Sequence, residues 1–454
     1  MSNAQPSRKA ALAIILGLFV AGASWAQDSS PGKSIVLENG LKVFFLEKHN
    51  WPLLSLAAAV NLGIKDESAE TSGLAHILEH CLLFRGSDDP EGRGLELDLR
   101  RHGAYLNGNT SQDLVVFEMC LSSTETDFGL ARMKDVLFGR HISQGGLDEE
   151  KEIILEEISQ LEDDPIRFAT ILLFQNVFKK HPYSNSVFGS KDTIKALPLE
   201  KVQQCYEKHF VPGNCAFALV GDFAIKDMEE KVRVIFAGIK GESPAPVQFP
   251  KVSSVDKKVE LRQEMDVKDG YLLVGVVGPD YNDPDQFRAD VLTEIMGRGI
   301  NPMLNPVLRG RFDLVQTIQM NYAAFEYGGV IWLVFTLDPK NINRATNETI
   351  NFLKKAREQN YSRDEYPGED QRYVFDYLES AKNQIKFNVQ QAQERGLNLA
   401  GSIARHMLLT RGGFERGYLK NIEKLSPSDL RAIAGRYLGK GEYVVVSVTP
   451  QKKI

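Results

Sequence analysis

The sequence contains little cysteine, and the few cysteines are scattered. Among its 454 residues there are four, and Cys205 and Cys215 form the only close pair. This small number excludes a disulfide framework and a zinc site built from thiolates. One bridge between Cys205 and Cys215 stays open as an alternative, although isolated cysteines more often fill the core as small apolar residues.

The chain also lacks an excess of positive charge and a long apolar run. Its formal net charge is −6, so it has no basic surface that would indicate nucleic acid or anionic lipid as a partner. No segment reaches the roughly 20 apolar residues that a membrane-spanning helix needs. We therefore expect no nucleic-acid partner and, in the mature protein, no membrane span.

The first 26 residues differ in composition from the rest. Arg8 and Lys9 precede the apolar run AALAIILGLFVAGA, and the small residues of SWA precede Gln27. This order is typical of a cleaved secretory signal. We expect a mature protein that begins at Gln27 and is periplasmic or secreted. An uncleaved membrane anchor is the alternative.

The remaining chain is long enough for more than one core, and its pattern is mixed. Strand-like runs such as CAFALVGDF alternate with amphipathic helical runs such as LEKVQQCYEKHF. The mixture predicts an α+β fold rather than a doubly wound parallel sheet. Residues 238–257 are rich in Pro, Ser, Gly and Lys, which indicates a linker.

An internal repeat supports that boundary. LPLEKVQQCYEKHFVPGNCAFALV, from Leu197, aligns without gaps with LSPSDLRAIAGRYLGKGEYVVVSV, from Leu425, at an offset of 425 − 197 = 228. With the linker between the copies, the repeat predicts two similar tandem domains, residues 27–237 and 258–454. Each is expected to be a mixed, mostly antiparallel sheet with helices packed on one face.

The stretch SGLAHILEHCLL, residues 72–83, carries the chemistry that stands out most. On a helix, His76 and His80 lie on one face one turn apart, with Glu79 at its edge. Two neutral imidazoles at this spacing can bind one zinc ion, and the carboxylate can take a proton from water. H-x-x-E-H is the inverse of the H-E-x-x-H metalloprotease helix. Three fixed positions also occur by chance, so a structural helix rich in histidine stays open.

A catalytic zinc bound by two histidines needs a third protein ligand, and GLDEEKEIILEEISQLEDDP offers one. On a helical wheel one side carries Ile153, Glu157, Glu150, Leu161, Ile154 and Ile158. The opposite side carries Glu149, Glu152 and Glu156, which fits an ordinary solvated face. Glu150 and Glu157 therefore lie within an apolar stripe, where burying a carboxylate is costly unless a cation pairs with it.

Four blocks of the sequence, in their order and spacing, show a family resemblance. They are GLAHILEHCLLFRGS, GAYLNGNTSQDLVVFEM, EEKEIILEEISQLEDDP and the run from His181 to Phe223. Together they resemble the pitrilysin and insulinase type zinc metallopeptidases, the inverzincins, in a bacterial exported form with two domains. The resemblance covers residues 34–237 strongly and residues 258–450 more loosely.

The resemblance implies a role for each candidate residue. In the family the third zinc ligand is a glutamate on a helix far beyond the motif. Its separation from the motif is about the same as that between His80 and Glu157 in this chain, 157 − 80 = 77 residues. His76, His80 and Glu157 would then bind Zn²⁺, and Glu79 would orient and deprotonate the attacking water. Glu150 matches an auxiliary acidic residue that supports the site. The implied activity is hydrolysis of peptides or small unfolded proteins.

The resemblance also indicates how the substrate is held. GAYLNGNTSQD matches an edge strand to which a peptide adds as an extra strand, with Asn107 holding its backbone. Many members have alanine where this chain has Gly108. In the second half, Arg309 matches an arginine that binds substrate, but Gln316 stands where the family has a tyrosine. Either a nearby residue such as Tyr322 substitutes for the tyrosine, or a second subunit supplies the pair.

Gln316 in place of the family tyrosine raises the question of whether this chain is active without a partner. The second half contains a single histidine, His406, so it has no zinc motif of its own. The chain is expected to be weakly active alone and to pair with a homologous subunit that lacks the zinc motif and supplies the missing groups. A self-sufficient homodimer with a relocated donor is the alternative. A non-catalytic subunit of a heterodimeric peptidase is the rival function, against which the intact His76, Glu79, His80 and Glu157 argue.

Overall fold

The computed structural model describes residues 32–84, 94–139, 141–253, 255, 257–366, 374–410 and 417–451. The predicted signal segment, residues 1–26, lies outside this range, so the start at Gln27 and the exported location stay predictions. Among the described residues, none of the helices combines the length and the apolar character that crossing a membrane requires.

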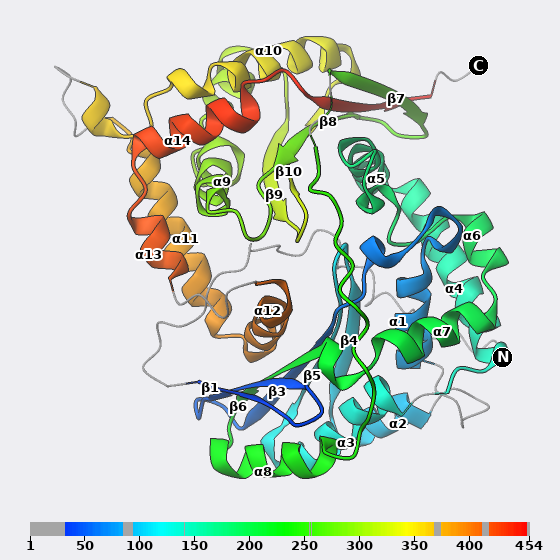
Figure 1. The fold of residues 1–454 in the computed structure, drawn as a ribbon. Coiled ribbons are helices and arrows are strands. Elements are labelled where there is room, and N and C mark those ends of the chain that lie inside the picture. Colours follow the sequence, from blue (N-terminus) through cyan, green and yellow to red (C-terminus); the bar gives the residue numbers. More distant parts are fainter. Residues whose placement is uncertain are drawn as a thin grey trace, which may run out of the picture.

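The described strands form two separate sheets (Figure 1). The first sheet has the order β1-β2-β6-β3-β5-β4 and contains β1 (Lys33–Val36), β2 (Lys42–Glu47), β3 (Leu53–Val60), β4 (Tyr105–Thr110), β5 (Val115–Ser122) and β6 (Cys215–Gly221). The second has the order β7-β11-β8-β10-β9 and contains β7 (Val259–Met265), β8 (Gly270–Gly278), β9 (Thr317–Ala324), β10 (Gly329–Leu337) and β11 (Val444–Pro450).

Five strands of the first sheet, all except β1, repeat the strand order of the second sheet, as the internal repeat predicts. β6 runs parallel to β2 and antiparallel to β3, and its counterpart β11 runs parallel to β7 and antiparallel to β8. Every other pairing in both sheets is antiparallel. The fold is therefore α+β with two similar tandem units, and this prediction is confirmed.

Both halves place most of their helices between the fourth-to-last and last strands of the chain order, and the first half has two more α-helices than the second among the described residues. The first half contains α1 (Leu74–Phe84), α2 (Gly94–Arg101), α3 (Thr126–Phe138), α4 (Gln144–Asp163), α5 (Pro165–Val177), α6 (Lys191–Ala196), α7 (Leu199–His209) and α8 (Ile225–Phe236). The second half contains α9 (Asp285–Thr293), α10 (Ile342–Lys354), α11 (Tyr377–Gln393), α12 (Gly396–Leu409), α13 (Tyr418–Glu423) and α14 (Pro427–Ile433).

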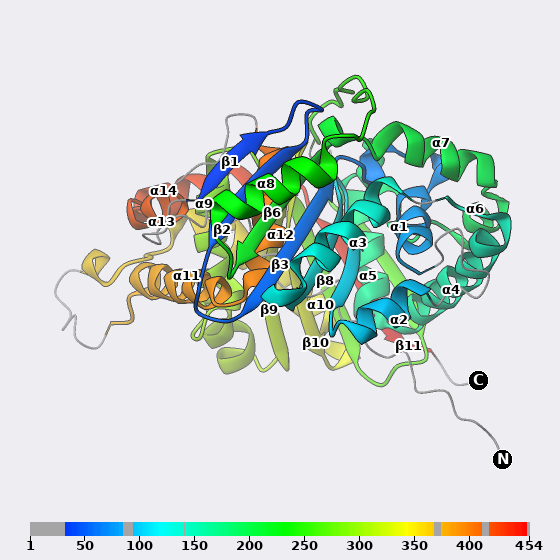
Figure 2. The same cartoon turned by 90° about the horizontal axis from the view of Figure 1, so that it is seen from below.

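The halves exchange one helix each. α12 of the second half packs on β3, β5 and β6 of the first sheet, and α5 of the first half packs on β8, β10 and β11 of the second. Figures 1 and 2 show α12 against the first sheet, and Figure 1 shows α5 beside the second. The sequence predicts helices on one face of each sheet; the other face receives a helix from the opposite half. Each half thus completes the other's core.

The core residues explain why these elements pack together. Every residue of β6, CAFALVG, is buried, because this strand is covered on both faces. Leu173 of α5 lies over Gly275 of β8, where an added Cβ would be 2.8 Å from its Cδ2 atom. Cys205 and Cys215 are free and buried in the first half, so the core interpretation of these cysteines is confirmed.

The connection between the halves contains no helix or strand among its described residues, 239–253, 255 and 257–258. It is nevertheless anchored to the second half, because the Val252 N–H donates to the Tyr327 carbonyl at 2.8 Å. Phe249 also packs edge-on against the Tyr327 ring. These features agree with a linker, while the domain boundaries themselves stay predictions.

Candidate metal centre

Helices α1 and α4 bring three potential metal ligands together from distant parts of the sequence. His76 Nε2 and His80 Nε2 each lie 3.8 Å from Glu157 Oε2, and the centroids of the two imidazole rings are 4.7 Å apart. Among the described residues, this is the group of histidines and acids whose ligand atoms gather closely enough to hold one ion. Its members are the three residues that the sequence predicts as zinc ligands.

The donor set fits zinc. Two imidazoles and one carboxylate are a common protein ligand set for a catalytic zinc, and a tetrahedral ion places its ligands about 3.4 Å apart. The 3.8 Å separations are close to that spacing. His76 is buried, and its Nδ1 has no hydrogen-bond partner among the described residues. Burial and the neighbouring His80 hold the pKa of His76 well below its usual range, which keeps the neutral, ligating form.

Glu150 lies behind His80, one turn before Ile154 on α4. Its side chain is fully buried, and its Oε2 is 3.1 Å from His80 Nδ1. Burial lowers the pKa of His80, but the Glu150 hydrogen bond and the nearby glutamates outweigh burial and raise it. A proton held on Nδ1 by Glu150 leaves the Nε2 lone pair facing Glu157, as in many zinc sites.

The two faces of α4 are as the wheel predicts. Glu149, Glu152 and Glu156 are exposed, whereas Glu150 is buried and Glu157 is half-buried. The helix begins after Ser143, whose hydroxyl accepts the Gly146 N–H at 3.1 Å. The apolar stripe of α4 packs into the hydrophobic core of the first half. Burial raises the pKa of Glu157, a cost that a cation at this position would offset.

Helix α1 is held at its N-terminus by a glutamate that the sequence analysis missed. The buried Glu67 carboxylate accepts the N–H groups of Gly73 at 3.0 Å and Ala75 at 2.8 Å. Burial raises the pKa of Glu67 to about 8. Gly73 has a φ of +92°, a backbone conformation that favours glycine, and it directly precedes the first residue of α1. The cap fixes the helix that carries both histidines.

Glu79 lies on the side of α1 that faces β4. Its side chain is buried, and the Thr110 hydroxyl donates to its Oε2 at 2.6 Å. Burial raises the pKa of the Glu79 carboxyl, although nearby His80 and Thr110 oppose this. A carboxylate beside the three ligands, and held by one directed hydrogen bond, is suited to accept a proton.

Strand β4 forms the edge of the first sheet, and no described strand pairs with its other side. Asn107 is half-buried on this strand, opposite Glu118 of β5. Gly108 follows it, and an added Cβ there would be 2.4 Å from Glu79 Oε1. The edge strand and Glu79 are therefore in direct contact.

The second-half candidates are Arg309, Gln316 and Tyr322. Arg309 and Gln316 are exposed, and no ion pair or hydrogen bond between described residues joins Arg309 to the first-half site. Tyr322 on β9 is buried, and its hydroxyl donates to the Pro279 carbonyl at 2.9 Å. Its hydroxyl is thus engaged inside the second half.

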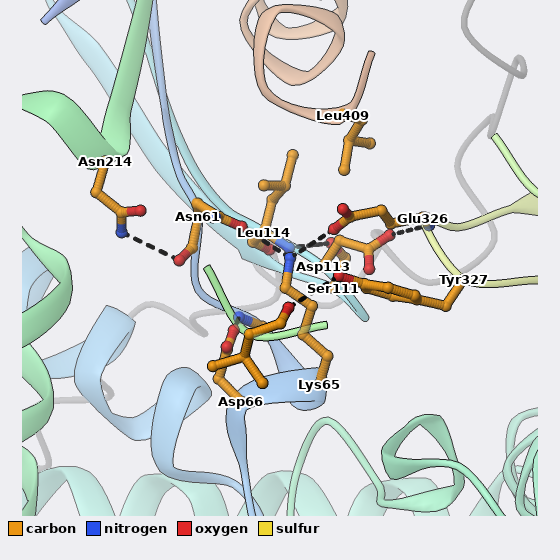
Figure 3. Close-up of polar contacts among 12 residues, drawn as sticks. Asn61, Lys65, Asp66, Ser111, Asp113, Leu114, Asn214, Glu326, Tyr327 and Leu409 are labelled. Atoms are coloured by element: carbon orange, nitrogen blue, oxygen red, sulfur yellow. Dashed lines mark hydrogen bonds and ion pairs between the residues drawn. The ribbon is translucent and has the colours of Figure 1, made fainter. Parts of the chain in front are cut away.

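A buried polar network joins the halves next to β4 (Figure 3). Lys65 Nζ donates to Asn61 Oδ1 at 2.7 Å and to Glu326 Oε2 at 3.1 Å. Asp113, in the turn after β4, accepts the Glu326 N–H at 2.9 Å and the Tyr183 hydroxyl. Burial raises the pKa of Asp113 to about 6. The turn after β4 is thereby tied to the turn between β9 and β10.

Two family models match this chain in succession. Residues 42–191, which include all three candidate ligands, match the model described as insulinase (peptidase family M16). Residues 196–368 match the model described as the peptidase M16 inactive domain. The chain belongs to peptidase family M16. The predicted family is therefore confirmed, and the H-x-x-E-H sequence lies in the half that matches the insulinase model.

Curated relatives are distant and partial. Zinc protease PqqE of Helicobacter pylori is 22% identical over 315 residues, which are 68% of this chain and 70% of that protein. The probable mitochondrial-processing peptidase subunit beta of Arabidopsis thaliana is 22% identical over 271 residues. This chain spans only 49% of the Arabidopsis protein and 62% of an uncharacterized zinc protease of Streptomyces coelicolor.

Solved structures share the fold over nearly the whole chain. The crystal structure of a protease from Helicobacter pylori has a TM-score of 0.82 at 19% identity, and covers 93% of this chain and 100% of that one. The peptidase M16 inactive domain from Pseudomonas fluorescens has a TM-score of 0.79 at 17% identity, with 92% and 98% covered. At these identities the likeness concerns the fold.

Proposed function

We propose that this M16 family member is a zinc-dependent peptidase that hydrolyses peptide bonds in peptides or small unfolded proteins. The observation that carries the proposal is the meeting of His76, His80 and Glu157 beside Glu79. Zinc, when bound by these three residues, supplies a Lewis acid that polarises a carbonyl and acidifies water. The names of several relatives as zinc proteases support the same assignment.

The residues of this chain divide the work. Glu79 takes a proton from the attacking water and delivers it to the leaving amine. Glu150 keeps the proton of His80 on Nδ1. The free edge of β4 binds the peptide backbone as an added strand, and Asn107 contributes a side-chain hydrogen bond.

The test is a peptidase assay coupled to metal analysis. The purified chain should carry one zinc ion and cleave members of a mixed peptide library, as read by mass spectrometry. A zinc chelator should abolish cleavage, and added zinc should restore it. Cleavage that survives complete removal of zinc would contradict the proposal, and so would zinc binding without cleavage under any condition, including the presence of a homologous subunit.

We further propose that full activity requires a homologous partner subunit. Gln316 stands where the family resemblance places a tyrosine that stabilises the transition state, and the Tyr322 hydroxyl is engaged with Pro279. Losing one such donor typically lowers the rate by about a hundredfold to a thousandfold. Relatives named as subunits of a processing peptidase favour a partner over a homodimer.

The partner proposal predicts a weakly active isolated chain. Its kcat should rise by about a hundredfold when a homologous subunit without the zinc motif, co-purified from the native host, is added back. Gel filtration with light scattering gives the stoichiometry in parallel. A fully active isolated chain that no copurifying homologue stimulates would contradict a shared site.

A further inference from the structure

Strand β4 presents one face to helix α1. Successive side chains of a strand point to opposite faces, so Leu106, Gly108 and Thr110 share a face. Gly108 and Thr110 both meet Glu79, which shows that this face lies against α1. On α1, Glu79 lies about 60° around the helix from His76, on the side away from His80. The base thus lies at the edge of the helix face that carries the two histidines, on the side next to β4.

The two β4 residues constrain both oxygens of Glu79. The Thr110 hydroxyl donates to Oε2 at 2.6 Å, and it opposes the burial that raises the pKa of this carboxyl. At Gly108 an added Cβ would be 2.4 Å from Oε1 and 2.7 Å from Cγ. One oxygen is therefore held by a directed hydrogen bond, and the other occupies space that only glycine leaves open.

Thr110 is followed directly by a hydrogen-bonded turn. The Ser111 N–H donates to the Leu114 carbonyl at 2.9 Å, and the Ile64 N–H donates to the Ser111 carbonyl at 3.2 Å. Asp113 then ties the turn to the second half through the Glu326 N–H at 2.9 Å. The residue that donates to Glu79 is therefore followed by a turn that hydrogen bonds from both halves hold in place.

We propose that Thr110 is a positioning residue, whose hydroxyl fixes the Glu79 carboxylate in the orientation in which it accepts the proton. Gly108 supplies the space for that orientation. The proposal rests on the proposed peptidase function. It adds that β4 has two roles: side chains on one face of the strand orient Glu79, and the free edge of the strand binds the peptide. One strand would therefore position both the base and the substrate. Without the hydroxyl, the broad terminal torsion of a glutamate leaves the carboxylate free to rotate.

Thr110→Val tests this, because valine keeps the shape and removes the hydroxyl. The close contact of Gly108 with Glu79 remains, so the expected loss in kcat is about tenfold, with KM and zinc content unchanged. Thr110→Ser keeps the hydroxyl and should retain most of the activity. Thr346→Val is the matched control. Its hydroxyl is similarly buried and donates to Ile342 of its own helix at 2.8 Å, and the change should leave kcat unaltered.

Crystal structures of the metal-free wild type and Thr110→Val provide a readout that does not need activity. The wild type should show Glu79 bonded to Thr110, and the variant should show a rotated or split Glu79 carboxylate. An unchanged Glu79 conformation in the variant, or an unchanged kcat, would overturn the positioning role. If instead the wild type cleaves nothing, alone or with its partner, the peptidase function fails while the crystal comparison still decides the positioning role.

Discussion

Glu79→Gln should abolish peptide hydrolysis while leaving the zinc content and the fold intact. Glutamine has the size of glutamate and keeps an oxygen that can accept the Thr110 hydroxyl, so the contact with β4 at 2.6 Å can persist. The amide cannot take up a proton. Loss of a general base typically lowers the rate by roughly 10²- to 10⁴-fold.

The measurement is steady-state hydrolysis of one identified peptide, with zinc content and melting temperature determined on the same samples. Glu156→Gln is the matched control, because Glu156 is exposed on α4 and should tolerate the change. A Glu79→Gln variant that cleaves at the wild-type rate would show that another group is the base.

Glu157→Ala should remove most of the zinc affinity, whereas Glu156→Ala should leave it unchanged. Glu157 Oε2 lies 3.8 Å from both histidine Nε2 atoms, and the neighbouring Glu156 points to solvent. Even residues that support a ligand without touching the metal contribute about 10- to 100-fold in affinity. Loss of a direct ligand should therefore exceed about a hundredfold.

Competition with a chelator of known affinity gives the zinc dissociation constants. Glu150→Gln should fall between the two alanine variants, at about 10- to 100-fold, because Glu150 acts through His80 Nδ1 at 3.1 Å. Equal zinc affinities for Glu157→Ala and Glu156→Ala would contradict the assignment of the two faces of α4.

Local pattern and the family resemblance predicted most of the candidate site. The period of α4 separated Glu150 and Glu157 from Glu156, because burying a carboxylate is costly enough to leave a clear mark in sequence. The repeat predicted two similar sheets, since a helix, turn and strand recur at a fixed offset. The strand GAYLNGNT was correctly placed at a sheet edge by the resemblance.

The rest depends on contacts between distant residues. Glu67 caps α1 through two backbone groups, and backbone donors leave no signal in a sequence. The exchange of α5 and α12 was not predicted, because periodicity shows that a helix face is buried but not which sheet covers it. The Thr110 contact with Glu79 could have been suspected only from the alternation that places Gly108 and Thr110 on one face of β4.

The most direct test of the metal centre is anomalous diffraction from crystals of the zinc-loaded protein, with data recorded on both sides of the zinc absorption edge. The account predicts one zinc peak per chain, bonded at about 2.0–2.2 Å to Nε2 of His76, Nε2 of His80 and an oxygen of Glu157. A zinc peak elsewhere in the chain, with none between α1 and α4, would contradict it.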